Sequence, residues 1–314
     1  MKISRPHLGL RTVAQCEPDL YCTAIAARRP CSCILDSVPQ LQTFEFEGCR
    51  FAYRVEGEGP PLMMIQGVGA QGTAYNPQIE ILKARYACLT YDNRGIGASQ
   101  PAAKTITVNQ MARDALALMD HVGSSSAHII GHSLGGLVAL ELALMARPRV
   151  RSLTLLNTFA SGAAASHMTL RLLWIVLRLQ FAPRPFRRDA FMELVLAPGE
   201  GKAKVRGLAE RMARVLGHDV ADLPSISNQQ LSAMRAADVT GRLAELSGIP
   251  TLVISGEKDM IARPSLGRAI ASGIPGARYL EIAGASHAFP ILEAERCAVL
   301  IMEHLAGAET RWAG

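Results

Sequence analysis

Six short apolar runs, each ending in turn residues, constrain the fold of this 314-residue chain more than any other feature. In chain order they read PLMMIQG, YACLTYD, AHIIGHS, RSLTLLN, PTLVISG and RYLEIAG. Strands that are apolar throughout are buried on both faces, which is typical of parallel strands covered by helices. Segments with helical spacing separate most of them, and we expect helices near 77–83, 108–122, 134–146, 266–272 and 293–305. This alternation predicts an α/β fold, with a mostly parallel sheet and helices on both faces.

Two further features complete the predicted domain organisation. From Thr43, TFEFEG and CRFAYRVEGEG alternate apolar and polar residues around a Glu-Gly turn, which predicts an antiparallel hairpin at the edge of the sheet. Between Ala160 and about Leu246 no strand is expected, and four stretches have helical spacing. We therefore expect an N-terminal extension, an α/β core in two pieces, and a helical cap inserted between two core strands. Their bounds are 1–40 for the extension, 41–159 and 247–314 for the core, and 160–246 for the cap.

The first helical stretch of the expected cap, LRLLWIVLRLQF, is strongly apolar. We expect its leucines, together with Trp174, Phe181 and Phe186, to pack the cap onto the core. Two alternatives are that some of these side chains line an apolar acyl or aromatic pocket, or that the stretch is a membrane-surface helix flanked by Arg171 and Arg178.

A glycine-rich turn after the strand AHII is the most informative motif. It reads Gly131-His132-Ser133-Leu134-Gly135-Gly136 and leads into a helix. A tight strand-to-helix turn strains its central residue, and small residues two before and two after it let the two chain segments pass closely. Ser133 would then stand out from the sheet as a nucleophile. A serine at this place can also be a simple helix cap, but a cap does not require three flanking glycines.

A serine nucleophile requires a base and a group that orients the base. PTLVISG continues as Glu257-Lys258-Asp259, and RYLEIAG continues as Ala285-Ser286-His287, so both groups come at the carboxyl edge of the sheet. We predict that His287 is the base and that Asp259 fixes its tautomer and stabilises its charged form. The chain order Ser, Asp, His is the one expected for this arrangement. Glu257 is the alternative acid, but it follows the strand directly and is the weaker candidate.

Two neighbouring side chains are not assigned a catalytic role, and His132 is interpreted as structural. Asn157 occupies the other place where an acid could stand, after the strand RSLTLL, and it cannot supply the negative charge that stabilises an imidazolium. His132 precedes the predicted nucleophile, and strand alternation suggests that it points to the other side of the turn.

Acyl transfer also requires hydrogen-bond donors for an oxyanion. The backbone N–H of Leu134 is the first predicted donor. The N–H of Val68, in the loop 66–70, is the second, although this loop can also be a plain turn. The loop YDNRGIGAS contains spaced glycines but lacks the GKS/T ending and the full GxGxxG pattern, so we interpret it as a brace for the site and not as a nucleotide loop.

The motifs IQGVG, YDNRGIGAS, IIGHSLGG, ISGEKD and GASHAFP resemble those of the α/β-hydrolase superfamily, and the resemblance extends from about Thr43 to the C-terminus. The resemblance is to a serine carboxylesterase-like member with a helical cap. One departure is Gln66, where the family usually has the histidine of a His-Gly pair. Relatives that are dehalogenases or epoxide hydrolases use an aspartate at the elbow, whereas this chain has Ser133. The implied activity is therefore cleavage of a small-molecule ester, apolar or aromatic in character, through an acyl-enzyme.

The alternatives are a carbon-carbon bond hydrolase or lactonase acting with the same triad, and a ligand receptor that keeps the fold without catalysis. The mechanism needs no organic cofactor and no metal, and the histidines show no metal-ligand spacing such as HExxH. The sequence leaves the oligomeric state open.

Composition excludes several other classes of protein. Thirty-three Lys and Arg against 27 Asp and Glu give a formal charge of +6, which is too small to indicate a nucleic-acid partner. The surplus is +2 in residues 1–40 and +4 in residues 160–240. Every stretch of eighteen residues contains a polar or charged side chain, which argues against stable membrane insertion. The first residues lack the apolar run of a secretion signal, which favours the cytoplasm.

Overall fold

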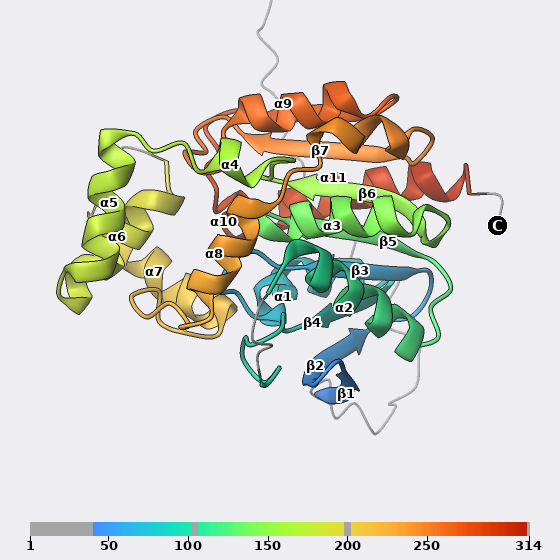
Figure 1. Cartoon of the computed structure of the whole chain (residues 1–314), viewed down its shortest axis with the longest axis horizontal. Helices are drawn as coiled ribbons and strands as arrows, with labels where there is room; N and C mark the ends of the chain where they lie inside the picture. The colour runs from blue at the N-terminus through green and yellow to red at the C-terminus, as the bar shows by residue number, and fades with distance from the viewer. Residues whose placement is uncertain (1–39, 102–105, 198–201, 313–314) are drawn as a thin grey trace, which may run out of the picture. The chain divides into compact units, whose positions relative to one another are not determined.

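A computed structural model of the chain describes residues 40–101, 106–197 and 202–312, with the side chains of 202–205 excepted. The predicted extension, apart from residue 40, lies outside the described residues. The described chain forms an eight-stranded sheet in the order β1-β2-β4-β3-β5-β6-β7-β8 (Figure 1). The strands are β1 Gln42–Phe46, β2 Cys49–Glu56, β3 Pro61–Ile65, β4 Ala87–Tyr91, β5 Ala127–His132, β6 Val150–Leu156, β7 Thr251–Gly256 and β8 Arg278–Ile282.

The sheet is antiparallel at one edge and parallel elsewhere. β1 pairs antiparallel with β2, and β2 with β4, whereas every other neighbouring pair is parallel. The turn between β1 and β2 has positive φ at Glu47 (42°) and Gly48 (71°), as a two-residue hairpin turn requires. The predicted fold class and the edge hairpin are confirmed.

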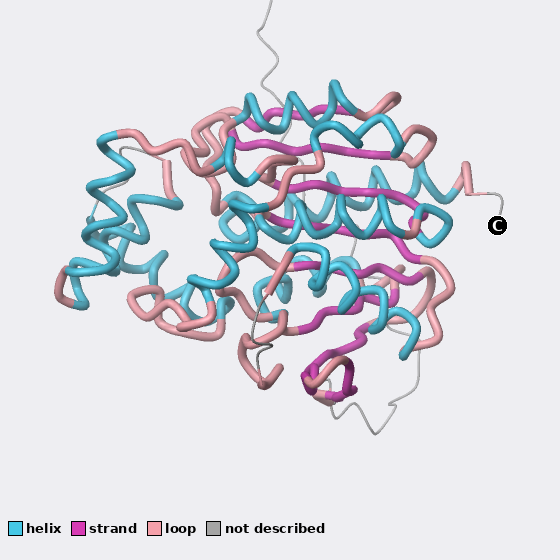
Figure 2. Tube along the Cα trace, in the orientation of Figure 1, coloured by secondary structure: helices cyan, strands magenta, loops and turns pink. Residues whose placement is uncertain are grey.

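Helices cover both faces of the sheet, which lies as one layer of strands in Figure 2. They are α1 Asn76–Leu82, α2 Val108–His121, α3 Leu134–Met145, α9 Pro264–Gly273, α10 Phe289–Leu292 and α11 Ala294–Glu309. Successive residues of β5 enter different apolar cores, since Ile129 packs with α2 and α3 while Ile130 packs with α1 and α11. This explains why apolar residues stand on both faces of these strands. The five expected helices are confirmed, and α10 is an additional short one.

Residues 160–246, here called the inserted segment, connect β6 to β7 through helices. These are α4 Gly162–Ala165, α5 Leu170–Phe181, α6 Arg184–Val195, α7 Lys202–Leu216 and α8 Ser227–Ala236, followed by a 3-10 helix at Thr240–Leu246. The last helical stretch is broken after α8 because Val239 N–H bonds to Ala160 O (2.9 Å) and Asp238 Oδ1 accepts from Thr240 N–H (2.9 Å). That this segment forms a separate cap domain stays a prediction.

The inserted segment packs on the core through α4, α6, α7 and α8 and not through α5. Met192 and Val195 of α6 and Met212 of α7 form an apolar cluster with Ala70 and Ala288 of the core. Only one residue of α5 is buried, Ile175, and Leu170, Trp174 and Phe181 are exposed. The expectation that the apolar run of α5 packs onto the core is therefore wrong for these side chains. The physical reason is that α6 and α7 already fill the contact with the core, so α5 packs against α6 at the outer side (Figure 1).

Candidate functional site

The predicted nucleophile stands on a strained turn between β5 and α3. Ser133 has φ 55° and ψ −122°, a conformation that costs a non-glycine residue about 1–3 kcal/mol. The neighbouring glycines make the turn possible. A Cβ on Gly131 would lie 2.3 Å from Gly135 O, and a Cβ on Gly135 would lie 2.1 Å from Ile65 O. The sequence folds in this way because only glycine lets β3, β5 and α3 approach so closely.

The end of β6 holds the same turn. Ser133 N–H donates to Leu156 O (3.0 Å), and the hydroxyl of Thr158 donates to Ser133 O (2.6 Å). A Cβ on Gly136 would lie 2.4 Å from Thr158 Oγ1, so the third glycine makes room for this threonine. The backbone of Ser133 is thus fixed on both its donor and its acceptor side.

The predicted base and acid meet after β8 and β7. His287 Nδ1 lies 2.7 Å from Asp259 Oδ2, and both side chains are buried. The other carboxylate oxygen, Asp259 Oδ1, accepts from Ile261 N–H (2.8 Å) and Ala262 N–H (2.9 Å). Glu257, the alternative acid, instead accepts from Gly284 N–H (2.7 Å) with its Oε2. The structure therefore brings Asp259 to the imidazole, and the ring's Nε2 remains on the side away from the carboxylate.

His132 lies against His287, so the expectation that it points to the other side of the turn is wrong. The two ring centroids are 4.9 Å apart, and His132 Nε2 lies 3.2 Å from His287 O. Burial, and secondly the neighbouring imidazole, lower the pKa of His132 to about 3, so this ring is neutral near pH 7. His132 is the last residue of β5, where the chain leaves the regular strand for the turn, so strand alternation is a poor guide at this position. The contact brings His287 next to the elbow, although the hydrogen bonds of the described residues do not include one from Ser133 Oγ to His287.

Asn157, just after β6, holds the loop of the predicted base. Its Nδ2 donates to Ser286 O (3.0 Å) and His287 O (3.0 Å), and its Oδ1 accepts from Gly256 N–H (2.8 Å). The side chain is fully buried, and its φ is 44°. From the sequence, Asn157 is considered only as a residue standing where a catalytic acid could be, and its hydrogen bonds to the loop of His287 are not predicted. A polar residue that tolerates positive φ at the end of a buried strand was the available signal.

The loop of the second predicted oxyanion donor runs beside the elbow. A Cβ on Gly67 would lie 3.1 Å from Ser133 Cβ, so the loop before Val68 approaches the serine as closely as glycine allows. No described residue accepts a hydrogen bond from the N–H of Val68 or of Leu134. Leu134 begins α3, whose N-terminal N–H groups favour negative charge. The arrangement offers two donors near Ser133.

Helices of the inserted segment are tied to this site by hydrogen bonds that span the sequence. Gln230 of α8 accepts from Gly69 N–H through Oε1 (2.9 Å). Ala288 N–H, next to His287, donates to Val195 O at the end of α6 (3.1 Å). These ties join a predicted donor loop and the predicted base to helices that lie more than ninety residues away in the chain. No local sequence pattern indicates them.

Three buried polar atoms around the same loop have no partner within the described part of the chain. They are Gln66 Nε2, Ser227 Oγ and Gln230 Nε2. Gln66 precedes the turn, while Ser227 and Gln230 pack against Gly69. A buried donor without an acceptor costs about 1–3 kcal/mol, so such atoms are suited to a polar group that arrives from outside.

The loop 91–99, which the sequence predicts to be a brace, makes hydrogen bonds to the segment before α1 and to Gln66. Asp92 accepts from Gly72 N–H through Oδ1 (2.8 Å) and from Ala98 N–H through Oδ2 (3.0 Å). Asn93 Nδ2 donates to Gln66 O (3.3 Å), which holds the start of the predicted oxyanion loop. Burial raises the pKa of Asp92 from its usual value, and its two backbone donors oppose this shift.

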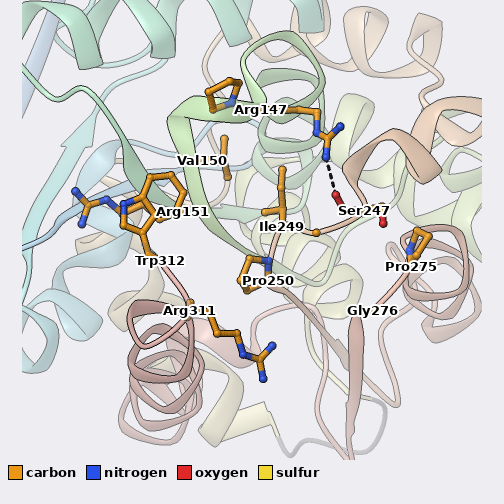
Figure 3. A pocket seen from close by; sticks show the side chains of 13 residues that line it. Arg147, Val150, Arg151, Ser247, Ile249, Pro250, Pro275, Gly276, Arg311 and Trp312 are labelled. Atoms are coloured by element: carbon orange, nitrogen blue, oxygen red, sulfur yellow. Dashed lines mark hydrogen bonds between the residues drawn. The ribbon is translucent and has the colours of Figure 1, made fainter. Parts of the chain in front are cut away.

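Two pockets lie at opposite edges of the sheet. The first, of about 570 Å³, lies between the start of α5 and the loop after β7, and it reaches Asp259. Its lining residues are His167, Thr169, Arg171, Leu172, Ile175, Glu257, Lys258, Asp259, Met260 and Arg263. The second, of about 710 Å³, lies by the amino ends of β6 and β7 beside Arg147, Arg151 and Trp312 (Figure 3). Only the first lies at the carboxyl edge where open α/β sheets hold ligands.

The described residues contain no group of three or more His, Cys, Asp or Glu side chains arranged to hold a metal ion. Among the described helices, none is both long enough and apolar enough to cross a membrane.

The sheet order, the strained turn and the residues gathered at its carboxyl edge define the α/β-hydrolase class. The chain belongs to this family: the model of the alpha/beta hydrolase fold matches residues 60–294. The candidate carbamate hydrolase RutD of Azorhizobium caulinodans is 32% identical over 238 residues, covering 76% of this chain and 88% of the relative. The protein is a hydrolase.

Solved structures show the same likeness. A hydrolase from Pseudomonas aeruginosa PA01 has a TM-score of 0.72 and 27% identity, covering 85% of this chain and 98% of the other. The enol-lactonase from Burkholderia xenovorans LB400 has a TM-score of 0.71 and 26% identity, covering 84% of this chain and all of the other (100%).

Proposed function

We propose that the protein is a serine hydrolase that cleaves carboxylic esters, with Ser133 as nucleophile, His287 as base and Asp259 as the acid that orients it. The observation that carries this proposal is the 2.7 Å contact between His287 Nδ1 and Asp259 Oδ2, next to the strained turn of Ser133. Because Nδ1 faces the carboxylate, the tautomer that carries its proton on Nδ1 is favoured and Nε2 is free to accept the serine proton.

The reaction proceeds in two stages. Ser133 Oγ attacks the ester carbonyl carbon while His287 Nε2 takes its proton, and the carbonyl oxygen becomes an oxyanion held by the N–H groups of Val68 and Leu134. The bond to the alcohol oxygen then breaks, and His287 returns the proton to the departing alcohol. Water attacks the acyl-enzyme in the same way and releases the carboxylic acid and free Ser133.

A small ester with an apolar or aromatic part is the proposed substrate. Leu172 and Ile175 give the pocket beside Asp259 an apolar wall, and Arg171, Lys258 and Arg263 give it a cationic rim. A pocket of about 570 Å³ is within the range of about 300–1,000 Å³ that suits small-molecule ligands.

Hydrolysis of p-nitrophenyl esters of graded acyl length tests the proposal. We expect turnover by the wild type with a maximum at one chain length, and none above background by Ser133→Ala. A fluorophosphonate should label the wild type and not Ser133→Ala. Absence of turnover for every chain length would refute ester cleavage, and labelling of Ser133 would then still identify a nucleophilic serine. Absence of both, with the protein folded, would favour a non-catalytic receptor.

A second candidate substrate is a lactone or carbamate with an additional oxygen acceptor near the reacting carbonyl, which a simple p-nitrophenyl ester lacks. The unpartnered Nε2 groups of Gln66 and Gln230 beside the oxyanion loop favour it, because they can donate to such an oxygen. The names of the enol-lactonase and RutD relatives point to the same acyl chemistry. Acid release from lactones, followed by pH-stat, and amine release from carbamates test it. Gln230→Leu should raise KM for these substrates more than for a p-nitrophenyl ester of the same size, and an equal effect on both would refute the assignment.

A further inference from the structure

The described chain gathers most of its exposed large apolar side chains in one short stretch, on α5, α6 and the residues just before α5. Seven of the twelve lie between residues 168 and 186: Met168, Leu170, Leu173, Trp174, Leu177, Phe181 and Phe186. Leu170 is 88% exposed, Trp174 61% and Phe181 78%. The positions 170, 173, 174, 177 and 181 recur at helical spacing, so they form one continuous stripe along α5. A contiguous apolar patch of this kind marks an interaction surface.

α5 is held on α6 by one buried side chain and two ion pairs, so the exposed stripe is not the result of a detached helix. Ile175 is fully buried. Arg171 and Arg178 both contact Glu193 of α6, at 3.3 Å and 2.7 Å. α5 is therefore held on α6 with its apolar stripe turned outward, and Figure 1 shows it on the side of the inserted segment away from the sheet.

Positive charge surrounds the stripe. Five arginines and two acidic residues lie between residues 168 and 195. In the structure two of these arginines share Glu193, and Arg184, Arg187 and Arg188 share Asp219 and Asp222. Each cluster keeps an excess cation after pairing. Over the whole inserted segment 12 basic residues face 8 acidic ones, a surplus of +4.

This charge discriminates between possible occupants of the patch. A second copy of the chain would bring the same cationic surface against itself, which is unfavourable. An anionic lipid surface complements it, and tryptophan and phenylalanine are the side chains that settle at the boundary between headgroups and acyl chains. A helix with an apolar face containing Trp, Phe and Leu and with flanking arginines is suited to lie in that interface without crossing the membrane.

We propose that the outer face of α5, with Phe186 of α6, docks the protein on an anionic lipid surface. Trp174 and Phe181 enter the headgroup region, and the arginines at the edge of the stripe contact the lipid phosphates. The surface is separate from Ser133, so docking does not depend on the proposed reaction. Ser133→Ala is expected to bind lipid as the wild type does.

Trp174 supplies a direct reporter of this docking because the chain has only two tryptophans. In full-length Trp312→Phe protein, Trp174 emission should shift to the blue with vesicles of phosphatidylcholine and phosphatidylglycerol at 2:1. The protein should co-sediment with these vesicles at least tenfold more than with phosphatidylcholine alone, and 0.5 M salt should weaken the binding. Equal binding to both vesicles, or an unshifted emission, would overturn the proposal.

A matched pair of variants distinguishes binding through this patch from non-specific binding of exposed apolar side chains to vesicles. Trp174→Ser with Phe181→Ser should lose at least tenfold in vesicle binding and remain folded, because both residues are exposed. Val299→Ser, at a 46% exposed apolar position on α11, should bind as the wild type does. Retained binding by the double variant would overturn the proposal. A second outcome would also overturn it: the wild type sediments as a dimer in the absence of lipid, the double variant sediments as a monomer, and neither protein binds vesicles. The patch would then join two copies of the chain.

Discussion

Replacing Asn157 by glycine should separate the positioning of His287 from the stability of the fold. Glycine tolerates the φ of 44°, so the change removes side-chain contacts without adding backbone strain. Three hydrogen bonds are lost. Ser286 O keeps Phe289 N–H (3.1 Å) and His287 O keeps His132 Nε2 (3.2 Å), whereas Gly256 N–H is left without its acceptor.

The magnitude follows from this count. Losing two bonds whose acceptors keep another donor costs about 0.5–1.5 kcal/mol each, and one orphaned buried N–H costs about 1–3 kcal/mol. We expect Asn157→Gly to lower the free energy of unfolding by about 3 kcal/mol in urea titrations. Because the loop of His287 also loses two donors, its imidazole should be misplaced. We expect kcat on the best p-nitrophenyl ester to fall about a hundredfold with KM little changed.

A variant of similar stability but distant from the site is the control. Ile301→Ala in α11 removes a fully buried side chain and should cost about 2–5 kcal/mol. It should leave kcat within about twofold of the wild type, since it touches none of the groups discussed. If Asn157→Gly had the kcat of Ile301→Ala, or unfolded at the wild-type urea concentration, the positioning argument would be refuted.

Three further predictions concern the scaffold. Gly135→Ala places a Cβ 2.1 Å from Ile65 O and should lower Tm by about 10 °C, corresponding to about 3 kcal/mol; an unchanged melting curve would contradict the close approach. Burial lowers the pKa of His304 to about 4, so below pH 6.5 the unfolded chain takes a proton that the folded chain does not. Going from pH 7 to 5 should cost about 2 kcal/mol through this residue, and His304→Gln should remove that part of the pH dependence of unfolding; an identical dependence would refute it. Arg94 and Asp114 form a buried pair at 2.6 Å, so Arg94→Met should lose about 3–5 kcal/mol in chemical denaturation, and adding Asp114→Leu should restore part of it.

The sequence was sufficient where the constraint is local. Three glycines around Ser133 predict a close turn because each leaves out an atom that would collide with a neighbouring strand or helix. Asp259 and His287 were predicted from strand ends, since the carboxyl ends of parallel strands meet at one edge. The structure adds the 2.7 Å contact between their side chains.

The sequence was insufficient where a partner lies far along the chain. Gln230 and Gly69 are 161 residues apart, and Asn157 reaches a loop 129 residues away. Helical periodicity also identified the apolar stripe of α5 but not its direction. A stripe can face a core or the outside, and only the packing of α6 and α7 decides between them.

Two of the hydrogen bonds between the inserted segment and the core have a consequence for substrate size. Gln230 holds the N–H of Gly69, which follows Val68, and Val195 holds the N–H of Ala288, which follows His287. A bound molecule that pushes α6 or α8 outward would also break the hydrogen bond to the loop of Ala288 or of Gly69 and displace that loop. A molecule too large for the site would therefore displace the loops of Val68 and His287 as well as lack room. Enlarging the pocket alone would not broaden the range of substrates.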